Sequence, residues 1–193
     1  MSTSAQAKGA GQDWLKTYYY LRFVVSAIWV ALAFTLARSA PALAAVMLVA
    51  YPAWDALANY LDASRSGGLA SNKTQMLNFV VSIVTAVAVA SALGRGMHTV
   101  LNIFGVWATL AGLFQLATAV RRWKSFGAQW AMVLSGAQSG LAGVHMLVKA
   151  AGTAPVGIAD IAPYAAFGAF YFLVSAVSLT ITDARHHARA LPA

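Results

Sequence analysis

Two charged side chains, Arg22 and Asp55, stand inside long apolar runs of the sequence. Arg22 is about five residues into the first run, and Asp55 is about six residues into the second from the same side. At 1.5 Å per residue both lie roughly 8–9 Å inside. A lone charge at that depth in a bilayer costs a few kcal/mol. The matched depths therefore predict that the two side chains lie close together.

Three interpretations of these charges follow from their chemistry. In the first, Arg22 and Asp55 form a structural ion pair. In the second, Arg22 extends to a lipid phosphate while Asn59 or a hydroxyl donates a hydrogen bond to Asp55. In the third, Asp55 is a proton-titratable group in a polar path. The structural interpretations are the simpler ones, and the proton path is the functional alternative.

Histidine is the other titratable group near the ends of these runs. His145 and Lys149 lie one helical turn apart, and His98 begins a run at the same side. Histidine titrates near pH 6.5, so His98 and His145 are candidates for a pH response. The simpler interpretation is that they contact lipid headgroups. His186 and His187 have no partner acids nearby, and we predict no metal site and no cofactor.

No catalytic set is visible in the sequence. Cysteine and glutamate are both absent, and the five acidic residues are all Asp. No Gly-rich phosphate loop, Gly-x-Ser-x-Gly motif or supported Ser-His-Asp arrangement is present. We therefore expect a protein that is not an enzyme and has no catalytic residues.

The composition indicates that lipid surrounds the elements carrying these residues. Apolar residues make up 60% of the 193 residues and charged residues 9%, whereas soluble domains carry about 25% charged residues. Six apolar runs are long enough to span a bilayer as helices. They cover about 17–37, 41–61, 75–93, 97–120, 128–150 and 160–182.

A short motif repeats at the start of alternate runs. Phe23-Val24-Val25-Ser26 recurs as residues 79–82, and Met-Val-Leu-Ser follows at 132–135. The pattern predicts an all-α membrane protein whose six transmembrane helices form three two-helix repeats, at about 17–61, 75–120 and 128–182. Two spans per repeat insert every copy in the same orientation, which predicts a pseudo-threefold arrangement. Residues 1–16 and 184–193 would be tails of a single domain over 17–183.

The net charge of +8 is best explained by the orientation of the chain in a membrane. Nine Lys and Arg residues fall in the tails and in the links 62–74 and 121–127, and three fall on the opposite side. This asymmetry predicts a multi-pass inner-membrane protein with both termini in the cytoplasm and with anionic lipids at that face. Nucleic acid is not an expected partner, because no soluble domain exists to hold it.

Small residues recur at every fourth position in several runs. Gly136 and Gly140 form one such pair, and Ala86 and Ala90 form another. Because such stripes allow close helix contact, we expect self-association through one of these faces, or binding of another protein.

The stretch from Trp107 to Arg122, followed by residues 130–136 and 140–143, resembles the HdeD-like family. The family pattern has three parts. A first span ends in a Gly, here Gly112, followed by regularly spaced apolar residues; a basic link containing a Trp comes next; and a second span carries a pair of glycines. Residues 105–143 fit the family pattern well, and the rest of the chain fits as diverged repeats. Asn59 stands where the second repeat has Gly112, and in the sixth span Tyr171 lies near the position at which the pattern expects a Gly. It implies six spans and a connection with acid resistance. No site residues can be transferred from the family.

These observations favour a non-catalytic inner-membrane protein that supports acid or envelope stress tolerance or assists a membrane complex. The alternative is a transporter or channel for a small solute or for protons. A continuous polar cavity containing Asp55, Asn59, Asn102 or Gln115 would favour the alternative. A tightly packed interior of Ala, Gly and Leu would favour the first interpretation.

Overall fold

The computed structural model is all-helical over the part of the chain that it describes. It describes residues 3–122 and 129–190, with side chains at 13–117, 120 and 133–185. The long helices are α1 (Thr3–Phe34), α2 (Pro41–Arg65), α3 (Lys73–Ala92), α4 (Met97–Arg122), α5 (Gln129–Ala151) and α6 (Ala162–Ala190). Three short 3₁₀ turns join them, η1 (Leu69–Ser71), η2 (Leu93–Arg95) and η3 (Ile158–Asp160).

Local sequence explains where the helices begin and end. Pro41 stands at the first position of α2, where its missing N–H costs nothing. Gly96 has φ of +100° between η2 and α4, a conformation that favours glycine. The predicted spans agree with the helices except at the chain ends. There α1 begins at Thr3 rather than near residue 17, and α6 continues to Ala190.

Five helices among the described residues are long and apolar enough to cross a membrane. They are Asp13–Phe34, Pro41–Arg65, Lys73–Arg95, Met97–Ala117 and Ala162–Arg185. The described part of α5 is not among them. The chain is a multi-pass membrane protein.

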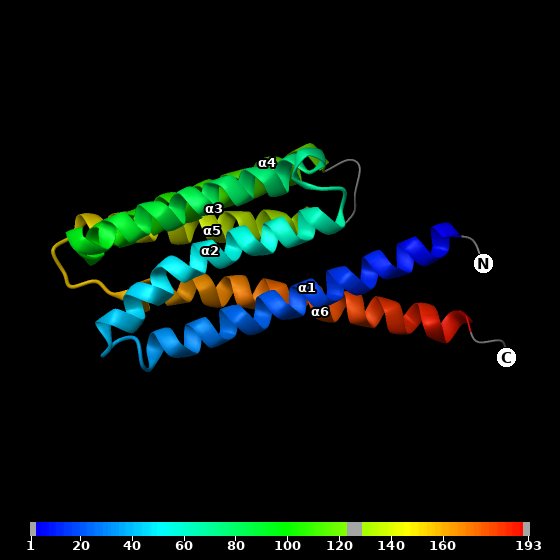
Figure 1. The fold of residues 1–193 in the computed structure, drawn as a ribbon, viewed down its shortest axis with the longest axis horizontal. Helices are drawn as coiled ribbons and strands as arrows, with labels where there is room; N and C mark the ends of the chain where they lie inside the picture. Colours follow the sequence, from blue (N-terminus) through cyan, green and yellow to red (C-terminus); the bar gives the residue numbers. More distant parts are fainter. Residues whose placement is uncertain (1–2, 123–128, 191–193) are drawn as a thin grey trace.

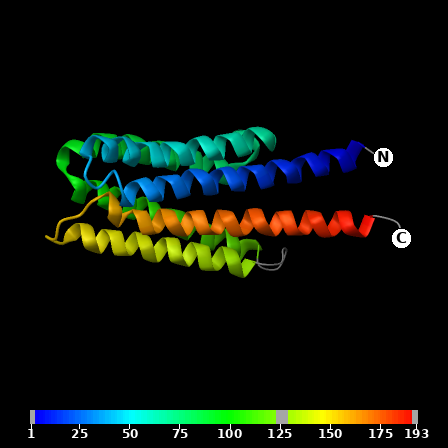
Figure 2. The same cartoon turned by 90° about the horizontal axis from the view of Figure 1, so that it is seen from below.

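The six helices form an elongated bundle (Figure 1). We call the end where α1 begins and α6 ends the terminal end, and the end with the α1–α2, α3–α4 and α5–α6 connections the turn end. At the terminal end α1 and α6 extend beyond the other four helices, as both views show (Figures 1 and 2).

Packing does not follow the two-helix repeats predicted from the sequence. The most extensive contacts join α4 with α5, α1 with α6 and α2 with α3. Within the predicted repeats, α1 contacts α2, α3 contacts α4 and α5 contacts α6 much less. The helices thus form a ring of alternating close and loose contacts, and α6 closes the ring on α1.

Glycines explain why α4 and α5 pack so closely. A Cβ atom added at Gly112 would lie 2.5 Å from the carbonyl oxygen of Gly136 and from the backbone nitrogen of Gly140. One added at Gly143 would lie 2.3 Å from Thr109 Oγ1. Gly136, which belongs to the stripe that we expected to mediate self-association, therefore lies at the contact between α4 and α5 within one chain.

Candidate functional site

An ion pair between Arg22 on α1 and Asp55 on α2 lies inside the bundle. The side chains are 13% and 19% exposed. Arg22 Nη1 also donates to the hydroxyl of Tyr18 at 2.9 Å. The structure thus brings together the two charges that the sequence analysis paired.

Asp55 also binds neutral donors from its own helix and from α3. Its Oδ2 accepts hydrogen bonds from Ser82 Oγ at 2.7 Å and from Asn59 Nδ2 at 3.1 Å. One carboxylate therefore connects three helices. Both oxygens of the carboxylate accept hydrogen bonds from side chains.

Aromatic rings flank the cation. The guanidinium carbon of Arg22 lies 4.2 Å from the ring centre of Phe172 on α6 and 5.7 Å from that of Tyr18. Cation–π contacts of this kind gain strength away from water. Arg22 therefore joins α1 to both α2 and α6.

Two cavities adjoin the ion pair. The central cavity, of about 440 Å³, lies among α1, α2, α4, α5 and α6. Its walls are Tyr19, Arg22, Ser26, Tyr51, Trp54, Asp55, Trp107, Ala111, Gln115, Ser135, Gln138, Ser139, Tyr164, Phe167, Gly168, Tyr171, Phe172 and Ser175. Hydroxyl and amide groups alternate there with aromatic rings, a combination typical of small-molecule sites.

The second cavity, which we call the α3-side cavity, measures about 580 Å³ and lies mainly among α2, α3 and α4. It shares Arg22, Asp55, Trp107, Ala111, Gln115 and Tyr164 with the central cavity. It also reaches Lys73 and Thr74 in the first turn of α3, which begins near the terminal end (Figure 1). The ion pair is therefore part of the wall between two polar spaces.

The serine of each repeated motif lines these cavities. Ser26 and Ser135 contribute to the central cavity, and Ser82 to the α3-side cavity. The three related positions thus supply hydroxyls to one polar region. The other two repeats have no charged residue at the positions that correspond to Arg22 and Asp55.

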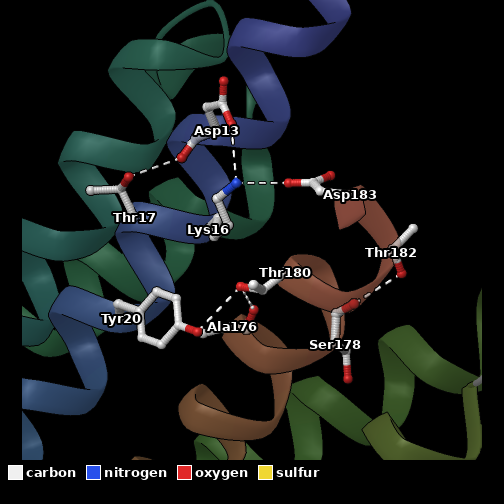
Figure 3. A network of polar contacts seen from close by, with 9 residues as sticks. All are labelled: Asp13, Lys16, Thr17, Tyr20, Ala176, Ser178, Thr180, Thr182 and Asp183. Carbon is white, nitrogen blue, oxygen red and sulfur yellow. Dashed lines mark hydrogen bonds and ion pairs between the residues drawn. The ribbon is translucent and has the colours of Figure 1, made fainter. Parts of the chain in front are cut away.

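A second polar network holds α1 against α6 nearer the terminal end (Figure 3). Lys16 Nζ lies 2.7 Å from Asp183 Oδ2 and 3.1 Å from Asp13 Oδ1. The hydroxyls of Tyr20 and Thr180 lie 3.2 Å apart. The Lys16–Asp183 and Tyr20–Thr180 contacts join the same two helices near the ion pair and so help to position Arg22 and Phe172, whereas the Lys16–Asp13 pair lies within α1.

The two candidate pH-responsive histidines lie near the turn end, and no described contact joins them. His98 Nδ1 lies 3.0 Å from the carbonyl oxygen of Ala150. His145 is exposed, and on its helix Lys149 forms an ion pair with Asp160. The pH response stays a prediction. No cluster of His and Asp suited to a metal ion occurs among the described residues, and His186 and His187 lie outside the described side chains.

The sequence analysis named four polar residues whose presence in one cavity would favour a transporter or channel, and the structure places three of them together and the fourth elsewhere. Asn59 and Gln115 line the cavities with Asp55. Asn102 does not, because it is exposed and lies in an apolar groove between α3 and α4. Three of the four predicted residues therefore gather around the ion pair.

Sequence reasoning missed several residues that contact the ion pair or line the cavities beside it. Tyr18 lies four residues before Arg22, and this helical spacing could have revealed it as a partner. Phe172 and Tyr164 carried no such signal, because their approach depends on how α6 closes the ring.

Comparison with known proteins gives one match. Residues 80–148 match the family model described as a short repeat of unknown function (DUF308). The matched segment runs from α3 through α4 to α5, and it contains the residues 105–143 on which the resemblance rested. The finer resemblance to HdeD-like proteins stays a prediction. No curated protein and no solved structure matches the chain.

Proposed function

We propose that this membrane protein binds a small polar solute without net charge in the cavities around Arg22 and Asp55, and allows it to cross the bilayer. The observation that supports this most is the pair of polar cavities, of about 440 and 580 Å³, on either side of the ion pair. A role without a ligand would call for close packing at this place. The buried apolar core of the described residues instead lies nearer the turn end.

The charge balance of the central cavity supports an uncharged ligand. Arg22 and Asp55 neutralise each other, and no other charged residue lines the central cavity. A charged solute would leave an uncompensated charge in a setting of low polarity. Hydroxyls, amides and aromatic rings instead suit a polyol or a sugar, which offers both hydrogen-bonding groups and C–H faces.

The proposal includes a topology. All six helices cross an inner membrane as three repeats inserted in parallel, with the terminal end in the cytoplasm. The shared position of the beginning of α1 and the end of α6 supports an even number of crossings (Figure 1). The excess of Lys and Arg in the tails and longer links supports the cytoplasmic assignment.

The role in acid or envelope stress stays a prediction, and passage of a solute is compatible with it. Catalysis is not part of the proposal. Self-association also stays a prediction. Its interface would have to involve a face other than the α4–α5 glycines, such as the one with Ala90, which is exposed.

Uptake into proteoliposomes tests the proposal. We expect the purified protein to admit radiolabelled myo-inositol or glucose faster than protein-free liposomes, and to exclude gluconate and glucosamine. Asp55→Asn should lower uptake at least tenfold, because it leaves the charge of Arg22 unpaired.

Asp13→Asn is the matched control. It makes the same chemical change at a side chain that is 75% exposed and lines neither cavity, so uptake should be unchanged. Uptake of all four probes at the rate of empty liposomes would contradict the proposal.

A further inference from the structure

The α5–α6 seam is the loosest contact between neighbouring helices in the ring. A third cavity, which we call the seam cavity, opens there with a volume of about 360 Å³. Its polar wall includes Gln138, His145, Lys149 and Asp160. The Lys149–Asp160 ion pair joins the last turn of α5 to η3, so the seam cavity lies toward the turn end.

The seam cavity and the central cavity share walls. Gln138, Tyr164 and Phe167 line both. Tyr164 also lines the α3-side cavity. One side chain therefore borders all three spaces, of which one reaches the beginning of α3 and another the beginning of α6.

We infer that the three cavities are sections of one path through the bundle and that the ring of Tyr164 is the barrier between its two ends. This inference rests on the proposed function. Two cavities that share a lining side chain approach each other at that side chain, and Tyr164 lines all three cavities.

The surroundings of Tyr164 allow its ring to move while its helix stays in place. Its neighbours Ile161, Ala162 and Ala165 are fully buried, so the backbone of α6 is fixed there. The ring contacts Trp107 edge-on, with centroids 5.9 Å apart. No hydrogen bond within the described part of the chain holds its hydroxyl. Rotation about its side-chain bonds would therefore break one aromatic contact and part of its packing against the apolar core.

Trp107 is less suited to act as the barrier. Its ring packs against three other rings, those of Tyr51, Phe104 and Tyr164, with centroids 5.8–6.0 Å apart. Each such aromatic contact contributes about 0.5–1.5 kcal/mol. Trp107 thus forms a fixed wall against which Tyr164 closes.

Labelling of a single cysteine tests the barrier. The chain has no cysteine, so Ser135→Cys places the only thiol in the central cavity and outside the seam cavity. In oriented proteoliposomes, a membrane-impermeant thiosulfonate should react with it from the terminal end alone. Adding Tyr164→Ala should raise labelling from the turn end at least tenfold.

Two matched variants separate the barrier from a general disturbance of the fold. Tyr164→Phe keeps the ring and should preserve one-sided labelling. Phe170→Ala removes a ring from the same helix at a position that is 56% exposed and lines none of the three cavities, so labelling should also stay one-sided. Each variant is accepted only if it runs as a single species in detergent.

The outcomes distinguish this inference from the proposed function. If Tyr164→Ala leaves turn-end labelling unchanged while myo-inositol uptake still depends on Asp55, the barrier is wrong and the proposed function stands. If labelling changes as expected but no probe enters, the barrier stands and solute transport is wrong. Labelling from both ends in the Ser135→Cys protein before any change at Tyr164 would also overturn the barrier.

Discussion

The two halves of this bundle are built from the same helices but have different interiors. Toward the turn end, Trp29, Leu48, Phe104 and Met146 belong to one buried apolar core. Toward the terminal end, the same helices present hydroxyls, amides and the Arg22–Asp55 pair to open cavities.

The difference shows which forces hold each half together. Lipid is as apolar as leucine, so apolar side chains gain little simply by leaving it, and close packing must stabilise the turn-end half. In the terminal-end half, Arg22 and Asp55 each have several partners. Hydrogen bonds and charge pairing therefore replace dense packing there.

The largest effect should come from the contact that runs along both halves, between α4 and α5. Gly143→Ala places a Cβ 2.3 Å from Thr109 Oγ1 and 2.7 Å from the carbonyl oxygen of Gly105. The helices must separate, so we expect the free energy of unfolding in mixed micelles to fall by about 3 kcal/mol or more.

Gly140→Ala is the control on the same helix, because its added Cβ meets no atom within 4 Å. It should leave stability unchanged or raise it by up to about 1 kcal/mol through helix propensity. Equal losses from both substitutions would show that close contact at Gly143 is not what joins α4 and α5.

A smaller effect should distinguish the two interiors directly. Phe104 is fully buried in the turn-end core, so Phe104→Ala opens a void. Because moving an apolar ring into lipid costs little, we expect a loss of about 2 kcal/mol of unfolding free energy, below the roughly 3–5 kcal/mol typical of soluble proteins. Gln115→Ala only enlarges a space that is already open, and its loss should stay under about 1 kcal/mol. If Gln115→Ala cost as much as Phe104→Ala, the contrast between packed and open halves would be lost.

The smallest effect concerns one hydrogen bond to the carboxylate. Ser82→Ala removes the donor 2.7 Å from Asp55 Oδ2, and interhelical hydrogen bonds in membranes contribute about 0.6–1.7 kcal/mol. Ser91→Ala removes a hydroxyl that bonds only the backbone of its own helix, so chemical unfolding should detect no comparable loss. A change for Ser82→Ala no larger than for Ser91→Ala would mean that the bond adds nothing to stability.

The helices and the charge pair could be predicted from the sequence, whereas the order of packing could not. Long apolar runs determine helices in lipid, and the depths of Arg22 and Asp55 restrict their partners. The closing of α6 on α1 depends on which faces fit together, and a hydrophobic pattern that is apolar on all sides does not mark those faces. For that reason the sequence did not indicate that Phe172 and Tyr164 line the site, and the prediction that Asn102 shares a cavity with Asp55 was wrong.

The closing of the ring has a consequence for biosynthesis. Arg22 and Asp55 lie on consecutive helices, so the charge in α1 can be neutralised as soon as α2 has been made. The partner of α1 along most of its length is α6, which leaves the ribosome after the other five helices. Until then the faces of α1 with Lys16 and Tyr20 lack their α6 partners, and the first five helices form an open arc that α6 closes.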